Sequence, residues 1–364
     1  MQARFFKAIV TALGIGLCSS IPHVVADPPP LSIGVILPLT GPSAFIGVTG
    51  KAAVDLAIAQ LPPEEKNRVK VIYEDDGLVA NRSVAAGHKL LDIDKVDALF
   101  TWSSSTGLSL ASLTERKQIP HISIASDPAV AVGRTYTFTY WALPQDEAET
   151  LYEYLVSSGK KRVAILAVTH NGLLATRDAL IDKANRDGRV QIVANEEVAP
   201  DTQDFRGVLE RIKSKGEFDA FIPIFFPGQL TVAVKQTRAL GIKAPLVGFE
   251  TFEDKDEIVA AQGLFSGVVF ATGADPSKDF VTAFQAANPG GTMYTASNCY
   301  DSVRLLIEAS RVGKDGDTVS TFLRSLKNYK AASGIISATG DNRFSLPTTL
   351  KTVDPSGQVV PFKG

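Results

Sequence analysis

Cysteine and histidine are scarce in this sequence, and their scarcity argues against several kinds of chemistry. The 364 residues include two cysteines and four histidines, and none of them has the spacing of a metal-binding motif. Neither a phosphate-binding glycine pattern nor a nucleophile elbow is present. We therefore expect a protein that is not an enzyme and that holds no metal or cofactor.

An excess of positive charge is also absent, as are long apolar runs beyond the first residues. Lys and Arg number 37 against 39 Asp and Glu, which gives a formal net charge of −2. This charge provides no electrostatic basis for binding nucleic acid or an anionic membrane surface. No internal segment is long and apolar enough to cross a bilayer. We expect no nucleic-acid partner, no direct membrane insertion and a monomeric protein.

The first 26 residues have the pattern of an export signal. A positively charged start is followed by an apolar stretch over residues 8–17 and by small residues up to Ala26. We predict cleavage after Ala26. A lipid anchor on Cys18 is not expected, because Leu17 stands where a lipoprotein signal carries a small residue. Cys299 is then the last cysteine left and cannot form an internal disulfide.

Strands and helices alternate along the rest of the chain in two runs. Strands are predicted at residues 31–37, 69–73, 96–100 and 121–124, and again at 162–168, 190–194, 218–226 and 246–248. Helices are predicted between them, at residues 51–61, 81–91, 106–117, 173–186, 205–215 and 230–240. Residues 136–146 lack a helical period and are interpreted as a crossing between two domains. This alternation predicts an α/β fold with two doubly wound parallel sheets.

A serine-rich turn, Ser103 to Thr106, lies between a predicted strand and a predicted helix. Serine and threonine are common helix caps. The unpaired N–H groups of the first helical turn, together with the hydroxyl groups, can also hold a carboxylate. Ligands of open α/β sheets bind beyond the carboxyl ends of the strands, which is where this turn would lie. The residues alone leave both interpretations open.

Several short motifs follow one another along the chain. They are Ile33-Gly-Val-Ile-Leu-Pro-Leu-Thr40, Tyr73-Glu-Asp-Asp76, Ser103-Ser-Ser-Thr106, Phe225-Phe226-Pro227, Gly248-Phe-Glu250 and Tyr300-Asp301. In this order and spacing they resemble the leucine/isoleucine/valine-binding proteins, which are type I periplasmic solute receptors of ABC importers. The resemblance extends over nearly all of the chain that follows the export signal.

The resemblance implies two lobes, joined by three crossing segments, that close on a small-molecule ligand in the periplasm. Lobe 1 would comprise residues 31–140 and 273–329, and lobe 2 would comprise residues 141–272 and 330–364. The closed complex would be presented to a membrane permease. An exported hydrolase, and a receptor that serves a signalling partner instead of a transporter, are the alternatives from other functional classes.

The resemblance also implies the positions of the ligand-binding residues. The ligand carboxylate would be held by hydroxyl and backbone groups of Ser103, Ser104, Ile124, Ala125 and Ser126. Glu250 falls on the acidic position that pairs with a ligand ammonium in the amino-acid-binding members, although a solvated loop charge is the alternative. Selectivity for the rest of the ligand would come from Ile46, Trp102, Asn171, Phe225 and Phe226. Each aromatic residue among them could equally belong to the core.

The expected ligand is an aliphatic or aromatic amino acid. Two departures from the family pattern leave open an aromatic acid, another organic acid or an amide without an amino group. Phe225-Phe226 replaces a tyrosine pair, and Asn171 stands where many members have a tyrosine.

Overall fold

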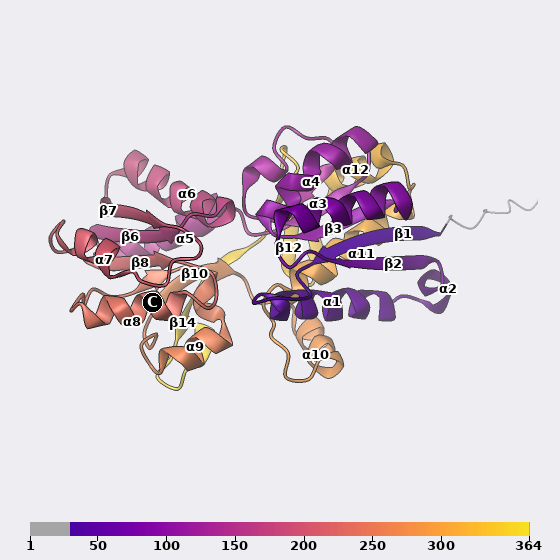
Figure 1. Ribbon diagram of the computed structural model, residues 1–364. Coiled ribbons are helices and arrows are strands. Elements are labelled where there is room, and N and C mark those ends of the chain that lie inside the picture. Colours follow the sequence, from indigo (N-terminus) through magenta and orange to yellow (C-terminus); the bar gives the residue numbers. More distant parts are fainter. Residues whose placement is uncertain (1–29, 364) are drawn as a thin grey trace, which may run out of the picture.

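The computed structural model describes residues 30–363, which form two α/β lobes lying side by side (Figure 1). The predicted export signal, residues 1–26, lies outside the described residues. No helix in the described range combines the length and the apolar character that a membrane span requires. The predicted class, two lobes built on parallel sheets, is confirmed.

Lobe 1 is built on a five-stranded parallel sheet with the order β2-β1-β3-β4-β5. Its strands are β1 (Leu31–Leu37), β2 (Val69–Asp75), β3 (Ala98–Trp102), β4 (His121–Ile124) and β5 (Thr137–Thr139). β1 is buried on both faces, since Val35 and Ile36 pack into different cores. β5 lies within residues 136–146, the segment that lacks a helical period. Its three residues are too few to show a strand pattern, and the pairing with β4 defines it as a strand.

Helices cover both faces of this sheet. One face carries α3 (Ala80–His88), its π-helical extension (Lys89–Ile93) and α4 (Ser104–Lys117). The other carries α1 (Ala44–Ala59), α10 (Lys278–Ala287), α11 (Ala296–Ser310) and α12 (Gly316–Ser325). The short helix α2 (Pro63–Lys66) follows α1, and a 3-10 turn (Pro128–Val130) follows β4. α1 begins at Ala44, before the predicted start at residue 51, and Gly47 is part of it. A Cβ there would lie 2.1 Å from the Pro38 carbonyl oxygen.

The predicted lobe boundary at residue 330 is wrong. The segment after it forms a small antiparallel sheet of β11 (Tyr329–Ala331), β12 (Gly334–Ala338) and β13 (Phe344–Ser345). Ile336, Phe344 and Leu346 pack into the same core as β1 and α11, and the Phe344 ring lies 6.2 Å from that of Phe138. The chain therefore leaves lobe 1 only after Leu346, because contacts between distant segments hold β12 and β13 there.

Lobe 2 has a parallel sheet of order β7-β6-β8 and a second sheet of order β15-β14-β10-β9. A bridge between Phe221 and Leu246 links the two. The strands are β6 (Arg162–Val168), β7 (Gln191–Val198), β8 (Ala220–Ile224), β9 (Val247–Gly248), β10 (Val269–Gly273), β14 (Thr348–Val353) and β15 (Val359–Pro361). β14 pairs antiparallel with both β10 and β15, whereas β9 and β10 are parallel.

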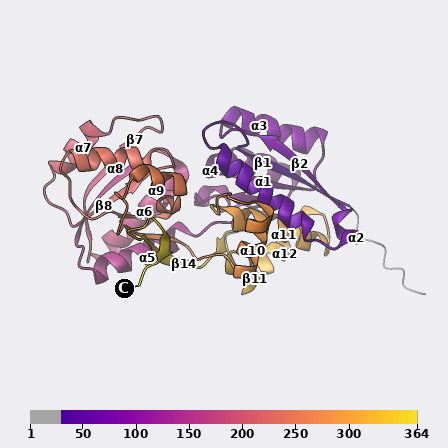
Figure 2. The same ribbon diagram turned by 90° about the horizontal axis from the view of Figure 1, so that it is seen from below.

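Helices again cover both faces of lobe 2. α5 (Pro144–Ser157) and α6 (Asn171–Asp187) pack on one face, and α7 (Arg206–Lys213), α8 (Leu230–Ala239) and α9 (Lys255–Ala261) pack on the other. A 3-10 turn (Glu250–Glu253) precedes α9. Seen from below, the two lobes are separate bodies joined by extended segments, including the one that leads into β14 (Figure 2).

Candidate functional site

Two adjoining cavities are lined by residues of both lobes. We call the smaller one, about 50 Å³, the serine pocket, and the larger one, about 380 Å³, the hinge chamber. Trp141, Glu250 and Tyr294 line both. The serine pocket brings together eight of the predicted site residues: Trp102, Ser103, Ser104, Ile124, Ala125, Ser126, Phe226 and Glu250. Its lobe 1 wall lies at the carboxyl ends of β3 and β4, as expected for a parallel sheet.

The serine turn is a helix cap. The Thr106 N–H donates to Ser103 Oγ over 3.1 Å, and the Ser103 N–H donates to the Ile124 carbonyl over 3.0 Å. Ser103 has a φ of +91°, which is uncommon for a residue with a side chain. The cap interpretation is therefore confirmed, and Ser103 and Ser104, at the start of α4, also line the serine pocket.

Trp102 and Ser104 complete the lobe 1 wall of the pocket. The Trp102 side chain is buried, and its Nε1–H finds no acceptor within residues 30–363. Ser104 Oγ accepts the Asp127 N–H over 3.2 Å, which leaves its own proton free to donate. This wall therefore presents donors in a place shielded from water, which is the chemistry of an anion site.

Glu250 provides the opposite chemistry from lobe 2. It follows β9 and begins the 3-10 turn, and its Oε2 is buried with no donor among the described residues. Burial raises the pKa of Glu250 to about 7, and the nearby charge of Glu253 adds to the shift. Asp254, also in the acidic run after Glu250, is buried and caps α9 through the Glu257 N–H. The interpretation of Glu250 as a solvated loop charge is therefore wrong.

A second buried carboxylate, Glu147, lies near Glu250. It is in the first turn of α5, is 1% exposed, and neither of its oxygens has a hydrogen-bond donor in the described part of the chain. Burial, followed by the charge of Glu250, raises the pKa of Glu147 well above its ordinary value. Its surroundings therefore stabilise the protonated form of Glu147 relative to the carboxylate.

The two lobes touch at the rim of the serine pocket. Ser105 Oγ of lobe 1 lies 3.0 Å from His170 Nε2 of lobe 2, and the His170 ring packs edge-on against Phe226, with a centroid distance of 4.7 Å. At Gly172, a Cβ would lie 2.6 Å from Ser126 Oγ and 2.8 Å from Ser104 Oγ. Only a glycine lets α6 approach the serine turn this closely.

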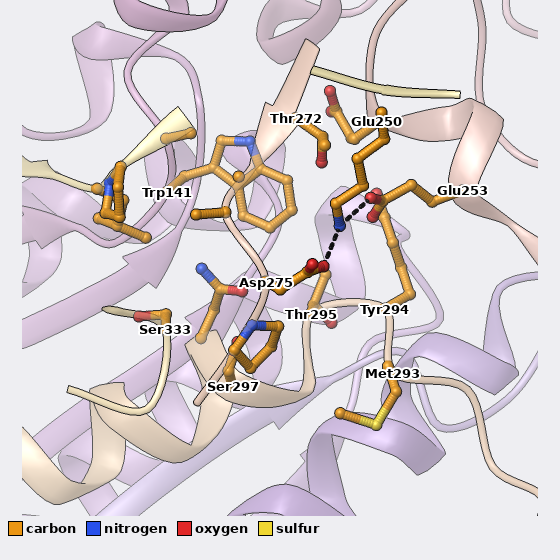
Figure 3. Close-up of a pocket in the computed structure, with 18 of the residues that line it drawn as sticks. Trp141, Glu250, Glu253, Thr272, Asp275, Met293, Tyr294, Thr295, Ser297 and Ser333 are labelled. Carbon is orange, nitrogen blue, oxygen red and sulfur yellow. Dashed lines mark ion pairs between the residues drawn. The ribbon is translucent and has the colours of Figure 1, made fainter. Parts of the chain in front are cut away.

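The hinge chamber lies beside the segments that connect the lobes (Figure 3). Lys351 Nζ lies 2.6 Å from a Glu253 oxygen and 2.5 Å from an Asp275 oxygen. Trp141 and Tyr294 meet edge to face, with ring centroids 6.3 Å apart, where the chamber joins the serine pocket. The lining of the chamber therefore includes an ion-pair network and, where the chamber joins the serine pocket, two aromatic rings.

Three predicted site residues line neither cavity. Phe225 is fully buried in the lobe 2 core, and its ring centroid lies 5.1 Å from that of Phe205. Ile46 is buried in the lobe 1 core. Asn171 is exposed at the start of α6. Phe225 and Ile46 are therefore packing residues. The sequence alone could not show that their side chains point into the cores of the two lobes.

Other residues line the serine pocket without having been predicted. They are Trp141, His170, Gly172, Leu173 and Tyr294. His170 and Gly172 follow β6 in the same way that Ser103 follows β3, so the alternation of strands and helices held the signal that could have found them. Trp141 and Tyr294 lie in irregular segments and have no such signal.

A comparison with known proteins shows the family. A family model described as "Periplasmic binding protein" matches residues 30–358. The Leu/Ile/Val-binding protein homolog 3 of Brucella melitensis is 26% identical over 364 residues, covering 94% of this chain and 95% of that protein.

Solved structures show the same fold. The leucine binding protein LivK of Thermotoga maritima has a TM-score of 0.83 at 20% identity, with 92% of this chain and 98% of that chain covered. An ABC transporter solute binding protein of Rhodopseudomonas palustris, solved with 3,4-dihydroxy benzoic acid, has a TM-score of 0.79 at 22% identity, with 91% and 96% covered. The chain therefore belongs to the periplasmic binding protein family, a group of two-lobed solute receptors that its sequence motifs already resembled.

Proposed function

We propose that this protein is a periplasmic receptor of an ABC importer and that it captures a zwitterionic amino acid by closing its two lobes. The observation that carries the proposal is a pair of unmatched polar atoms on two residues that line one small cavity. Trp102 Nε1 is a buried donor without an acceptor, and Glu250 Oε2 is a buried acceptor without a donor, among the described residues.

An amino acid matches both atoms at once. A buried polar atom that lacks a partner costs about 1–3 kcal/mol. A ligand carboxylate would accept from Trp102 and from the first N–H groups of α4, whose dipole also favours an anion. The ligand ammonium would donate to Glu250. These contacts come from different lobes, so both form only when the lobes are closed and the ligand stabilises that state.

An aromatic acid without an amino group is the second candidate. Four aromatic residues line the serine pocket: Trp102, Trp141, Phe226 and Tyr294. The Rhodopseudomonas palustris relative is a receptor solved with such an acid. With a pKa of about 7, Glu250 is partly protonated at neutral pH and could then donate to an uncharged ligand atom.

Calorimetry with three probes of one carbon skeleton separates these candidates. L-phenylalanine carries both charges, 3-phenylpropanoic acid lacks the ammonium, and L-phenylalanine amide lacks the carboxylate. We expect L-phenylalanine to bind tightest, and each half-ligand to bind about 10- to 160-fold more weakly, the equivalent of 1.5–3 kcal/mol for a hydrogen bond to a charged group. Equal affinity for 3-phenylpropanoic acid would favour the aromatic-acid candidate, and no binding of any probe would contradict both.

Trp102→Phe tests the carboxylate end. The variant keeps an aromatic ring in the core and removes only the Nε1–H donor and the second ring. Binding of L-phenylalanine should weaken and binding of its amide should stay nearly constant. An equal loss for both probes would mean that the indole acts through packing.

The partner and the site of action belong to the same proposal. A permease partner predicts that deleting the gene abolishes uptake of radiolabelled ligand, whereas a receptor for a signalling partner leaves uptake intact. We also propose that the protein acts as a monomer and performs no catalysis, so that the bound ligand is recovered chemically unchanged after dissociation.

A further inference from the structure

The hinge chamber holds most of the space available to a ligand. The serine pocket, at about 50 Å³, has room for about two water molecules. The chamber has about 380 Å³, and typical small-molecule sites have about 300–1,000 Å³. A ligand with its carboxylate beside Ser103 and its ammonium beside Glu250 must therefore direct its remaining atoms past Trp141 and Tyr294 into the chamber.

The charges on the chamber walls balance once Glu250 is excepted. Glu253 and Asp275 share the ammonium group of Lys351, and Lys255 contributes a second positive charge to the lining. Apart from Glu250, the lining thus carries two carboxylates and two ammonium groups. A charged side chain would lose its hydration on entering the chamber and would find no group in need of a counter-charge.

The neutral walls combine apolar and hydrogen-bonding groups. Met293 and Tyr294 lie on one side of the chamber, and Trp141 faces Tyr294 at an interplanar angle of 68° (Figure 3). Thr272 and Ser297 contribute hydroxyl groups to the lining of the same cavity. Such walls suit a flat apolar body with a polar end, because rings pack edge to face and a terminal hydroxyl can bond to the hydroxyl groups of the lining.

We propose that the hinge chamber is the side-chain subsite of this receptor and that it selects an α-amino acid with a large, uncharged aromatic side chain that ends in a hydrogen-bonding group. This inference rests on the proposed function, since Glu250 must be occupied by the ligand ammonium. Small branched aliphatic side chains leave most of the chamber filled with water and gain less from burial.

Two amino acids and one chamber variant test the subsite. L-tyrosine fits the proposed class, and L-valine does not. Ala274→Trp adds bulk to the chamber wall. The Ala274 N–H donates to the Pro347 carbonyl over 2.8 Å, and this backbone bond does not depend on the side chain. Ala260→Trp, at an exposed position of α9 outside the chamber, is the matched control.

We expect the wild-type protein to bind L-tyrosine at least about tenfold more tightly than L-valine in calorimetry. Ala274→Trp should weaken L-tyrosine binding by at least about tenfold and change L-valine binding by less than about threefold, and Ala260→Trp should change neither. If circular dichroism shows that Ala274→Trp does not fold, Ala274→Leu takes its place with the same expected order.

The outcomes separate the subsite from the function on which it rests. Equal affinity of the wild type for both amino acids, or an equal loss of both in Ala274→Trp, overturns the subsite and leaves the amino-acid receptor standing. Absence of binding for both amino acids contradicts the proposed function itself. Tighter binding of L-arginine than of L-tyrosine would contradict the balance of charges and overturn the selectivity for an uncharged side chain.

Discussion

Glu250→Gln is expected to weaken amino-acid binding and, at the same time, to stabilise the empty protein. The substitution keeps the shape of the side chain and one carbonyl oxygen while removing the ionisable group. Burial raises the pKa of Glu250 from 4.5 to about 7, and its Oε2 has no donor within residues 30–363. The ionised carboxylate therefore destabilises the empty protein, and a donor from a ligand would stabilise it.

The effect on stability follows from the direction of the pKa shift. Between about pH 4.5 and pH 7, the unfolded chain has lost the Glu250 proton while the folded chain still holds it, so the free energy of unfolding decreases as the pH rises through this window. Glutamine has no proton to lose. At pH 8 we expect the free energy of unfolding of Glu250→Gln to be about 1–3 kcal/mol higher than that of the wild type. At pH 4 the two values should differ little.

The effect on binding has the opposite sign. Losing a charged hydrogen-bond acceptor for the ligand ammonium should cost about 1.5–3 kcal/mol, or about 10- to 160-fold in affinity. In the wild type, the affinity should fall by up to about tenfold for each pH unit below 7, because the ammonium must displace the Glu250 proton. The affinity of Glu250→Gln should not change over this range.

Calorimetry in two buffers of different ionisation enthalpy measures both the affinity and the protons released. At pH 7 the wild type should release about half a proton for each amino acid bound, and Glu250→Gln should release none. Glu64→Gln, at an exposed position of α2, is the matched control. An unchanged affinity in Glu250→Gln, or an equal loss with 3-phenylpropanoic acid, would refute pairing with an ammonium.

Three further predictions concern closure and packing. Gly172→Ala should lower the affinity for every ligand about 5- to 150-fold, because its Cβ would lie 2.6 Å from Ser126 Oγ; X-ray scattering should show less compaction. Ser105→Ala, which removes the bond to His170, should cost about twofold to tenfold in calorimetry, equally for all ligands. Phe225→Ala should lower the free energy of unfolding by about 3–5 kcal/mol in urea titrations, because Phe225 is a core residue.

Local patterns in the sequence were sufficient to find the strands and helices of the two predicted runs, but not β5 or the start of α1. The apolar runs over β1 and β6 predict strands, and each strand is buried and has a neighbouring strand on both sides in its parallel sheet. Burial on two faces leaves a continuous apolar run that is visible without any knowledge of the neighbours. The alternation of strands and helices also located the serine turn, because ligands of parallel sheets bind at the carboxyl ends of the strands, whereas Glu250 was identified from the family resemblance.

Contacts between distant segments decided what the patterns could not. Phe225 and Phe226 are adjacent just beyond the end of β8, yet one ring packs into the core and the other lines the serine pocket. Likewise, β12 and β13 belong to lobe 1 because Phe344 packs on Phe138, far away in sequence.

The sequence by itself determined the alternation of strands and helices, the resemblance to the family and eight of the residues that line the serine pocket. Only the tertiary structure decided that a donor on Trp102 and an acceptor on Glu250 are both buried without partners among residues 30–363, on two residues that line the same cavity. A residue's type shows which hydrogen bonds it can make, but whether these bonds are made depends on the side chains that the fold brings around it.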